Sequence, residues 1–441
     1  MMFKYLMKVG VKFKKWFFLA FIGTFLLTIA ATQLIINEII DTNAKVIYGV
    51  LCCLGAIIIY ISVTECIKAI YELIENEKTK ISINDSDVDT LIDEERILVN
   101  GPKIVVIGGG TGLSTMLRGL KSYTSNITAI VTVGDDGGGS GVLRDDLGML
   151  PPGDIRNCIL ALADTEPLME DLLRYRFKEG TLKGQNFGNL FLAAMDGISD
   201  NFEDAVQKMS SVLAVTGKVL PVTLDDMKLI AELENGNSVV GESKIPKEAI
   251  NQKSKIKRLT INPKKAEPLQ DALTSILEAD AVVIGPGSLY TSIIPNLLVN
   301  DIVESIEKSE AIKIYISNVM TQPGETDDFT VCDHINSLIK HSSKKCVDYV
   351  IANNGEVTEE IKERYAKKSS ILVELDKEHI EDLGIEVIAD DLVKIQKGYI
   401  KHNTDKLAKL IMTTVLEKKL QVDKERIIEY IYILDKISSQ K

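Results

Sequence analysis

Histidine and cysteine are too scarce and too scattered in this sequence to build the metal or nucleophile sites that depend on them. The chain has four histidines, and no two of them have the spacing of a helical zinc pair. The six cysteines form no CxxC pair, and three of them lie in or next to apolar N-terminal segments. We interpret the cysteines as reduced thiols of a cytosolic protein. Zinc chemistry and a Ser-His-Asp mechanism are therefore not expected.

Positive charge is also lacking beyond the first part of the chain. Residues 1–69 carry seven lysines against three acidic residues, a net charge of +4, whereas the whole chain has a formal net charge of -12. The remainder therefore carries -16. A nucleic-acid partner is not expected, because phosphate backbones require clusters of Lys and Arg.

Two long runs without any charge lie near the N-terminus, at residues 16–36 and 46–64. A helix of this length can cross a hydrocarbon core of about 30 Å. Five lysines and no acid precede the first run, and nine residues separate the two runs. The positive-inside rule therefore predicts a two-span hairpin that leaves both chain ends in the cytosol. A cleaved signal peptide or a buried core hairpin is the alternative.

The rest of the sequence predicts a charged linker and one α/β domain. The predicted parts are a transmembrane hairpin at 1–69, a linker at 70–100 and a nucleotide-binding domain at 101–441. From Lys103 onward, short β-branched runs alternate with helical stretches, which is typical of parallel βαβ units. The predicted fold class is a Rossmann-like, doubly wound α/β fold with a mostly parallel sheet. A small β-hairpin subdomain is expected around residues 235–237, and two transmembrane helices precede the domain.

Glycines are concentrated where the first strands are expected to end, since 13 of the 30 glycines lie between residues 101 and 153. One cluster follows the strand expected at 103–107 and precedes a helix; it consists of Gly108, Gly109, Gly110, Thr111 and Gly112. Free amides at such a helix start bind phosphate. The cluster departs from GxGxxG because Leu113 replaces the last glycine, and no P-loop lysine follows. A tight turn without a ligand is the alternative.

Charged side chains follow the second expected strand. Asp135 and Asp136 stand where Rossmann folds hold a ribose hydroxyl, and paired carboxylates also suit Mg²⁺ beside a diphosphate. An Asp-Gly turn with both acids in water is the alternative. Ser140 lies in the same glycine-rich segment, and Arg144 is expected either to clamp a phosphate or to form a surface ion pair. Asp154 is predicted to N-cap the next helix.

Three later motifs are expected to complete the ligand site. Two asparagines flank a glycine at a helix start, where side-chain amides can read a base or sugar edge. A second glycine loop follows a later strand and precedes a helix, and a further asparagine ends the strand after that. The residues are Asn186 and Asn189, then Gly285, Gly287 and Ser288, and finally Asn318. Two glycine loops that face one crevice would suit a diphosphate.

Six of these motifs together resemble one protein family. GGGTGLS, VTVGDDGGGSG, LPPGDIRNC, QNFGNLFLAAM, GPGSLYTSIIPNLL and NVMTQPGET occur in this order from about residue 103 toward the C-terminus. They are similar to motifs of the YvcK-type gluconeogenesis factors, a group that is itself similar to the CofD-like transferases. This resemblance implies a nucleotide-sugar ligand such as UDP-N-acetylglucosamine and a regulatory role in cell shape and envelope synthesis on gluconeogenic carbon sources. It leaves open envelope-synthesis proteins and a second copy of the chain as partners. The two N-terminal spans are a departure from the commoner soluble members.

The function expected from the sequence is that of a ligand-sensing regulator in the cell membrane, with its large domain in the cytoplasm. No catalytic residue is assigned. The alternative is a CofD-like transferase that acts on a nucleotide-diphosphate-linked substrate, with Asp135 and Asp136 holding Mg²⁺. A nicotinamide oxidoreductase is a third reading, but the sequence lacks the third glycine that this reading requires.

Overall fold

The computed structural model describes residues 11–36, 42–78, 98–99, 101–396 and 398–422. The chain divides into two compact units, Met1–Thr90 and Leu91–Lys441. The predicted linker at 70–100 begins as a helix that ends at Lys78, and its residues 79–97 lie outside the described part.

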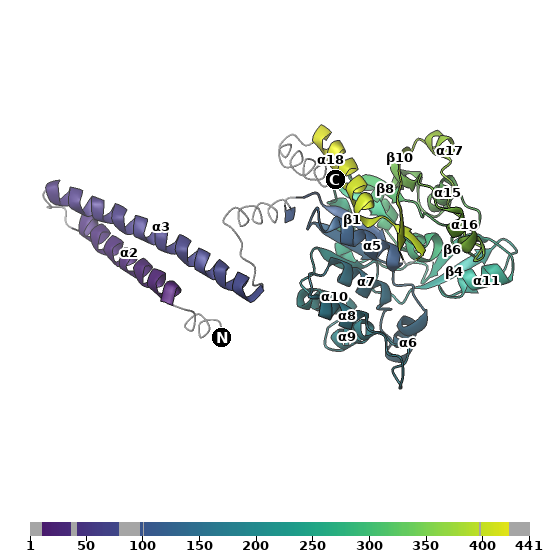
Figure 1. Ribbon diagram of the computed structural model, residues 1–441, viewed down its shortest axis with the longest axis horizontal. Helices are drawn as coiled ribbons and strands as arrows, with labels where there is room; N and C mark the ends of the chain where they lie inside the picture. The colour runs from purple at the N-terminus through teal and green to yellow at the C-terminus, as the bar shows by residue number, and fades with distance from the viewer. Residues whose placement is uncertain (1–10, 37–41, 79–97, 100, 397, 423–441) are drawn as a thin grey trace. The chain divides into compact units, whose positions relative to one another are not determined.

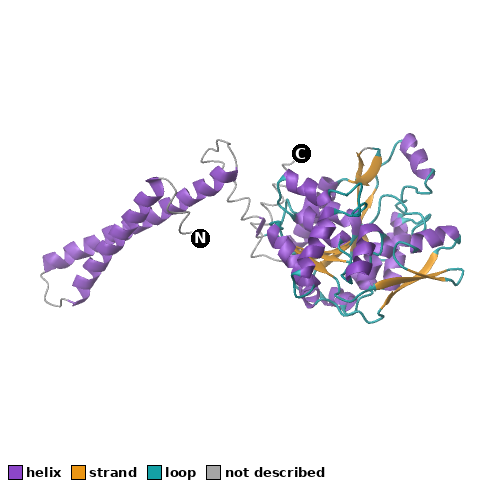
Figure 2. Cartoon of the chain, turned by 90° about the horizontal axis from the view of Figure 1, so that it is seen from below, coloured by secondary structure: helices purple, strands orange, loops and turns teal. Residues whose placement is uncertain are grey.

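The N-terminal unit is a pair of packed helices, α2 (Val11–Ile36) and α3 (Thr42–Lys78), which lie side by side in Figures 1 and 2. Small residues make the contact: a Cβ placed on Gly23 would lie 3.1 Å from the carbonyl oxygen of Gly55. Large apolar side chains are exposed instead, among them Phe21, Phe25 and Tyr60. Exposed large apolar groups around a contact of small residues are typical of helices packed in lipid.

One stretch among the described helices is long and apolar enough to cross a bilayer, namely Ile47–Glu65. It corresponds to the second predicted span at 46–64. The first predicted span at 16–36 contains only a shorter apolar stretch, Leu19–Ala30, and the side chains at both of its ends lie outside the described set. The described residues therefore provide one candidate span where the sequence predicted two.

The second unit is built on a seven-stranded sheet in which every strand pair is parallel. The order is β10-β9-β8-β7-β1-β2-β3. The strands are β1 (Ile104–Gly108), β2 (Ile127–Val131), β3 (Lys218–Pro221), β7 (Ala281–Ile284), β8 (Ile312–Ile316), β9 (Tyr349–Asn353) and β10 (Glu386–Asp390). Every residue of β1 and β7 is buried, as expected for central strands that are covered on both faces. The predicted Rossmann-like fold class is confirmed for this unit.

Helices enclose the sheet (Figure 2). Before the small sheet they are α5 (Gly110–Leu120), α6 (Gly138–Leu147), α7 (Gly153–Leu162), α8 (Pro167–Arg174), α9 (Phe187–Gly197) and α10 (Phe202–Val212). The later ones are α11 (Ile245–Asn251), α12 (Gln270–Leu277), the π-helix η1 (Leu289–Ile293), α13 (Ile294–Leu297), α14 (Ile302–Lys308), α15 (Val331–His341), the 3₁₀ turn η2 (Lys344–Cys346), α16 (Glu359–Ala366), α17 (Lys377–Asp382) and α18 (Thr404–Val422). The glycine-rich segment after β2, which reads as a loop in the sequence, becomes helical from Gly138 onward.

Two small antiparallel sheets are added to the main sheet. The predicted hairpin is formed by β4 (Lys228–Leu233) and β5 (Ser238–Val240). The structure adds β6 (Ile256–Asn262) as a third strand, which pairs with β4. The second small sheet is the hairpin of β11 (Val393–Gln396) and β12 (Tyr399–His402), which the sequence did not predict.

Strand β1 marks the point where the direction of chain winding reverses. It pairs with β2 on one side and with β7 on the other, and later strands extend the sheet beyond β7. In doubly wound folds, ligands bind outside the carboxyl ends of the strands at such a switch point. A ligand site is therefore expected at the carboxyl ends of β1 and β7.

Removal of residues 1–95 is expected to leave a folded protein, because the sheet, its core and its helices all lie in the second unit. The fragment should show one cooperative transition in differential scanning calorimetry. A fragment without such a transition would show that the N-terminal helices are needed for the fold.

Candidate functional site

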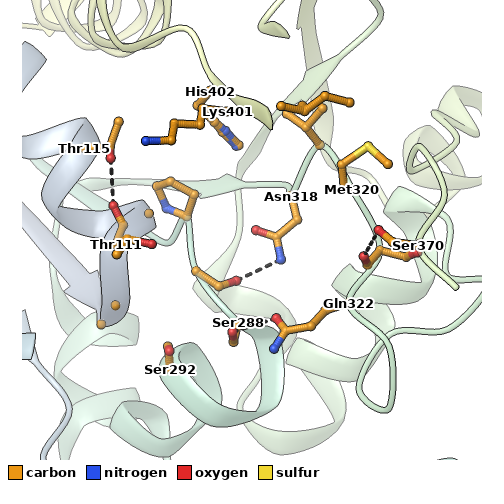
Figure 3. Close-up of a pocket in the computed structure, with 18 of the residues that line it drawn as sticks. Thr111, Thr115, Ser288, Ser292, Asn318, Met320, Gln322, Ser370, Lys401 and His402 are labelled. Carbon is orange, nitrogen blue, oxygen red and sulfur yellow. Dashed lines mark hydrogen bonds between the residues drawn. The ribbon is translucent and has the colours of Figure 1, made fainter. Parts of the chain in front are cut away.

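A pocket of about 470 Å³ opens at the carboxyl ends of β1, β7 and β8, at the switch point of the sheet (Figure 3). Its volume lies within the range of about 300–1,000 Å³ that is usual for small-molecule sites. It is lined by Gly109, Gly110, Thr111, Gly112, Thr115, Pro286, Gly287, Ser288, Ser292, Asn318, Val319, Met320, Thr321, Gln322, Pro323, Tyr365, Ser370, Ile400, Lys401 and His402. The two glycine loops and Asn318 thus meet in one crevice, as the sequence predicted.

The first glycine loop forms the wall at the start of α5. No side chain caps this helix at Gly109. Gly110 has a φ of +70°, and its backbone amide donates a hydrogen bond to the Asp154 carboxylate. Thr111 and Gly112 line the pocket in the first turn of α5, and no described side chain caps their amides, which therefore remain as donors beside the pocket. A Cβ at Gly112 would lie 2.8 Å from the carbonyl oxygen of Pro286, so only glycine lets the two loops come this close.

The second glycine loop differs from its prediction. The amides of Tyr290 and Thr291, at the start of η1, both hydrogen-bond to the carboxylate of Glu325. These are amides that the sequence assigned to a ligand phosphate, and the protein's own carboxylate occupies them. The expectation that both loops offer open helix N-terminal amides is wrong for this loop. Ser288 and Gly287 still line the pocket, whereas Gly108, the last residue of β1, and Gly285, which follows β7, do not.

The C-terminal hairpin and α16 contribute a wall that sequence reasoning missed. Lys401 and His402 of β12 line the pocket, and the amide of Ile400 donates to the Tyr365 hydroxyl at 2.8 Å. Neither ring nitrogen of His402 has a hydrogen-bond partner among the described residues, and burial lowers its pKa to about 4. The imidazole is therefore neutral at pH 7. The one glycine of this hairpin, Gly398, serves its turn and is not followed by a helix, so the sequence alone gave no reason to choose the segment.

The charge of the pocket lining favours an anionic ligand. Among the described residues that line it, Lys401 is the one permanent cation and no carboxylate is present. Figure 3 shows Lys401 on the same side of the pocket as Thr111 and Thr115. A lysine ammonium beside free helix N-terminal amides is a suitable setting for phosphate oxygens.

Four predicted site residues lie outside the pocket lining, and three of them have hydrogen-bond or ion-pair partners within the protein. Asp135 accepts from the Gly137 amide at 2.8 Å, and Asp136 accepts from the Ser243 amide at 2.8 Å, which attaches the small sheet to the end of β2. Buried Arg144 pairs with Asp226 and also donates to the carbonyl oxygen of Met227 at 2.8 Å. Ser140 is buried near Gly153. These contacts assign structural work to residues that the sequence proposed as ligand groups.

The two predicted asparagines also lie outside the pocket lining. Asn186 caps α9, since its side chain accepts from the Asn189 amide at 3.2 Å. The Asn189 side chain accepts from the Arg156 guanidinium at 2.8 Å. Both asparagines are buried. They order the region around Arg156 and do not present free amides to the crevice.

Carboxylates gather on the other side of the first glycine loop. The predicted N-cap role of Asp154 is wrong, because α7 begins at Gly153 without a side-chain cap and Asp154 binds the Gly110 amide. Burial and the charge of Asp135 raise the pKa of Asp154 to about 6. The same two causes raise the pKa of Glu242 to about 8. The described residues include no group of three side chains placed to hold a metal ion, so these acids do not form a ready metal cage.

Known proteins share this α/β unit. A family model described as 2-phospho-L-lactate transferase CofD matches residues 104–393. A provisionally named gluconeogenesis factor of Clostridium acetobutylicum is 54% identical over 435 residues, which are 98% of this chain and 96% of that protein. The gluconeogenesis factor of Bacillus subtilis is 48% identical and covers 72% of this chain and 99% of its own length. A crystal structure of a Bacillus halodurans protein, 46% identical, has a TM-score of 0.69 and covers 71% of this chain and all of that one.

The replacement Glu242→Gln is expected to stabilise the protein at high pH. Because the folded state holds this proton up to a pKa of about 8, against 4.5 as the ordinary value, the free energy of unfolding falls as pH rises from 4.5 through 8. The variant should unfold at a higher temperature than the wild type at pH 9 and at the same temperature at pH 4. Calorimetry across pH measures this, with Glu234→Gln, an exposed acid in the turn between β4 and β5, as the control. Equal curves for wild type and variant at pH 9 would contradict it.

Proposed function

The chain belongs to the CofD family and to the gluconeogenesis factors within it, and on that premise we propose that its pocket binds a nucleotide sugar such as UDP-N-acetylglucosamine for a regulatory purpose. The supporting observation is the position of the pocket in the fold together with the charge of its lining residues. It lies at the switch point, between the open start of α5 and Lys401, with no carboxylate among its described lining residues. A diphosphate is the ligand group that this combination suits best.

In this proposal the diphosphate lies against the amides of Thr111 and Gly112 and is neutralised in part by Lys401. The nucleoside and the sugar then extend along the remaining walls, toward Asn318 and Gln322 on one side and His402 on the other. A neutral imidazole is suited to a base or a hydroxyl and less so to a phosphate, which would favour its protonated form. No step of bond making or breaking is required of these residues.

The regulatory part of the proposal comes from the family. Relatives that are 48–54% identical are named gluconeogenesis factors, a name that describes a physiological need and not a reaction. We propose that occupancy of the pocket reports the supply of an envelope precursor, and that the protein acts on cell shape through envelope-synthesis proteins. A homo-oligomer is compatible with this role.

A membrane location is a further part of the proposal. The N-terminal unit exposes large apolar side chains and buries small ones, and Ile47–Glu65 has the length and composition of a span. The Clostridium acetobutylicum relative matches 98% of this chain, so the similarity extends into this unit. We propose that the helices anchor the protein and that the α/β unit lies in the cytoplasm.

A CofD-like transferase is the second candidate, and one observation favours it. Asp154 and Glu242 both lie close to Asp135, since burial and the charge of Asp135 raise the pKa of each of the two, and no described residue hydrogen-bonds to Glu242. Mg²⁺ is often held by only one or two carboxylates together with substrate phosphates and water, so such a group could hold it with a bound diphosphate. The metal would then neutralise charge on the phosphates during transfer.

Replacement of Lys401 tests the pocket, and replacement of Asp135 separates the two candidates. Lys401→Met should weaken UDP-N-acetylglucosamine binding about ten- to a hundredfold, the effect of losing about 1.5–3 kcal/mol from a charge-assisted hydrogen bond. Asp135→Asn should leave binding unchanged with and without Mg²⁺, because its carboxylate serves a turn outside the pocket. Isothermal titration calorimetry measures both.

Lys394→Met is the matched control, since Lys394 faces Lys401 across the hairpin and does not line the pocket. Unchanged affinity in Lys401→Met would remove the pocket from the proposal. A loss in Asp135→Asn that appears only with Mg²⁺, together with turnover of a nucleotide-linked substrate, would favour the transferase.

The membrane part predicts that full-length protein sediments with membranes from lysed cells and that alkali does not extract it. The reason is the apolar surface of α2 and α3, which water would solvate poorly. Ultracentrifugation followed by immunoblotting is the measurement, and a chain without residues 1–95 is the control. Full-length protein in the supernatant would contradict the anchor.

A further inference from the structure

We propose that one wall of the pocket presents only hydrogen-bond acceptors, fixed at Ser288 by Glu325 and at Asn318 by the Gly287 carbonyl oxygen, so that a bound ligand must present an N–H or O–H donor to this wall. Glu325 is a positioning residue in this account, because it does not line the pocket and acts through Gln322. The inference rests on the proposed function, since it concerns the ligand of the same pocket.

The carboxylate of Glu325 is buried and fully engaged. Its side chain is 3% exposed, and it accepts from the Tyr290 amide at 3.2 Å, from the Thr291 hydroxyl at 3.1 Å and from the Gln322 side-chain amide at 2.5 Å. The Oε1 of Glu325 accepts from the Thr291 hydroxyl and is also the atom that faces Gln322, so the Gln322 atom that meets it is the donor Nε2. This orientation sends the other end of the Gln322 amide, the Oε1, away from Glu325.

The Oε1 of Gln322 in turn fixes the proton of Ser288. The Ser288 hydroxyl donates to this oxygen at 2.6 Å (Figure 3). A hydroxyl has a single proton, and once that proton is donated its oxygen can only accept further hydrogen bonds. Ser288 therefore offers the pocket an acceptor and no donor.

Asn318 is oriented in the same sense by a different partner. Its Nδ2 donates to the carbonyl oxygen of Gly287 at 2.9 Å, which leaves its Oδ1 as the second acceptor on this wall. No described residue donates to that Oδ1, and Figure 3 shows Asn318 on the same wall as Ser288. We call Ser288 Oγ and Asn318 Oδ1 the acceptor pair.

The two sides of the pocket therefore differ in what they can bind. The α5 amides and Lys401 are donors and suit phosphate, whereas the acceptor pair would repel phosphate oxygens and suits N–H or O–H groups. The second glycine loop is thus a specificity wall and not a second phosphate cradle. In a nucleotide sugar, the required donor can come from the nucleoside, that is the base or the ribose, or from the sugar.

Three single variants test this in the full-length protein in detergent, with UDP and UDP-N-acetylglucosamine as probes in calorimetric titrations. Ser288→Ala deletes one acceptor and should weaken binding about two- to tenfold, the effect of one lost hydrogen bond. Glu325→Gln should weaken it about as much. Its amide N–H₂ can donate to Gln322 Oε1, which rotates the Gln322 amide and turns Ser288 into a donor.

Thr291→Val is the matched control. It has the same shape as threonine, removes one hydrogen bond to the same carboxylate, and leaves the link to Gln322 in place. Its affinity for both probes should equal that of the wild type. The double variant Glu325→Gln/Ser288→Ala should lose no more affinity than the larger single loss, because both changes act on one hydrogen bond.

The outcomes show which part of the ligand carries the donor. They also distinguish a failure of the acceptor pair from a failure of the proposed function. A loss with both probes supports a donor on the nucleoside, either the base or the ribose, and a loss confined to UDP-N-acetylglucosamine supports a donor on the N-acetylglucosamine. Wild-type binding that survives unchanged in Ser288→Ala and Glu325→Gln would overturn the acceptor pair alone, as would an equal loss in Thr291→Val. If Glu325→Gln does not fold, Ser288→Ala decides the question. A wild type that binds neither probe would overturn the proposed function and this inference with it.

Discussion

The close approach of two backbone loops, after β1 and after β7, is the constraint on which the candidate site depends. At Gly112 a side chain would meet the carbonyl oxygen of Pro286, and at Gly109 it would meet both Asp154 and Thr132. Because the loops touch, the start of α5 and the segment after β7 become adjacent walls of one pocket. A fold with the same strand order but bulkier loops would fill the switch point instead of leaving it open.

Internal carboxylates satisfy much of the donor capacity that these loops create. Asp154 takes the Gly110 amide, and Glu325 takes the amides at the start of η1. Their burial raises both pKa values, to about 6 and about 7, so holding them has an energetic cost. What remains for a ligand is a smaller set of donors on one wall and a set of acceptors on the other. The polarity of the pocket therefore follows from the protein's own anions.

Much of the architecture could be predicted from the sequence, because buried parallel strands leave an unmistakable apolar pattern. Strands β1, β2, β7 and β8 and the hairpin of β4 and β5 lie where they were expected. The site was predicted in part: the glycine loops and Asn318 meet in the pocket, but Arg144, Asn186 and the two aspartates have structural partners. The sequence can show that a glycine loop precedes a helix, whose first amides lack helical partners. It cannot show which carboxylate, distant in the sequence, accepts hydrogen bonds from those amides. Lys401 and His402 were missed because a short strand of mixed polarity carries no such pattern.

Two helices, α5 and α18, connect two walls of the pocket. Helix α5 starts at the pocket and meets α18 near its other end, where a Cβ at Gly119 would lie 2.7 Å from the carbonyl oxygen of Thr404. Helix α18 begins two residues after His402, which itself lines the pocket. Helix α5, helix α18 and strand β12 are thus connected in one continuous series. The first turn of α5 and the strand β12, which form two walls of the pocket, are therefore connected through the packing contact between α5 and α18.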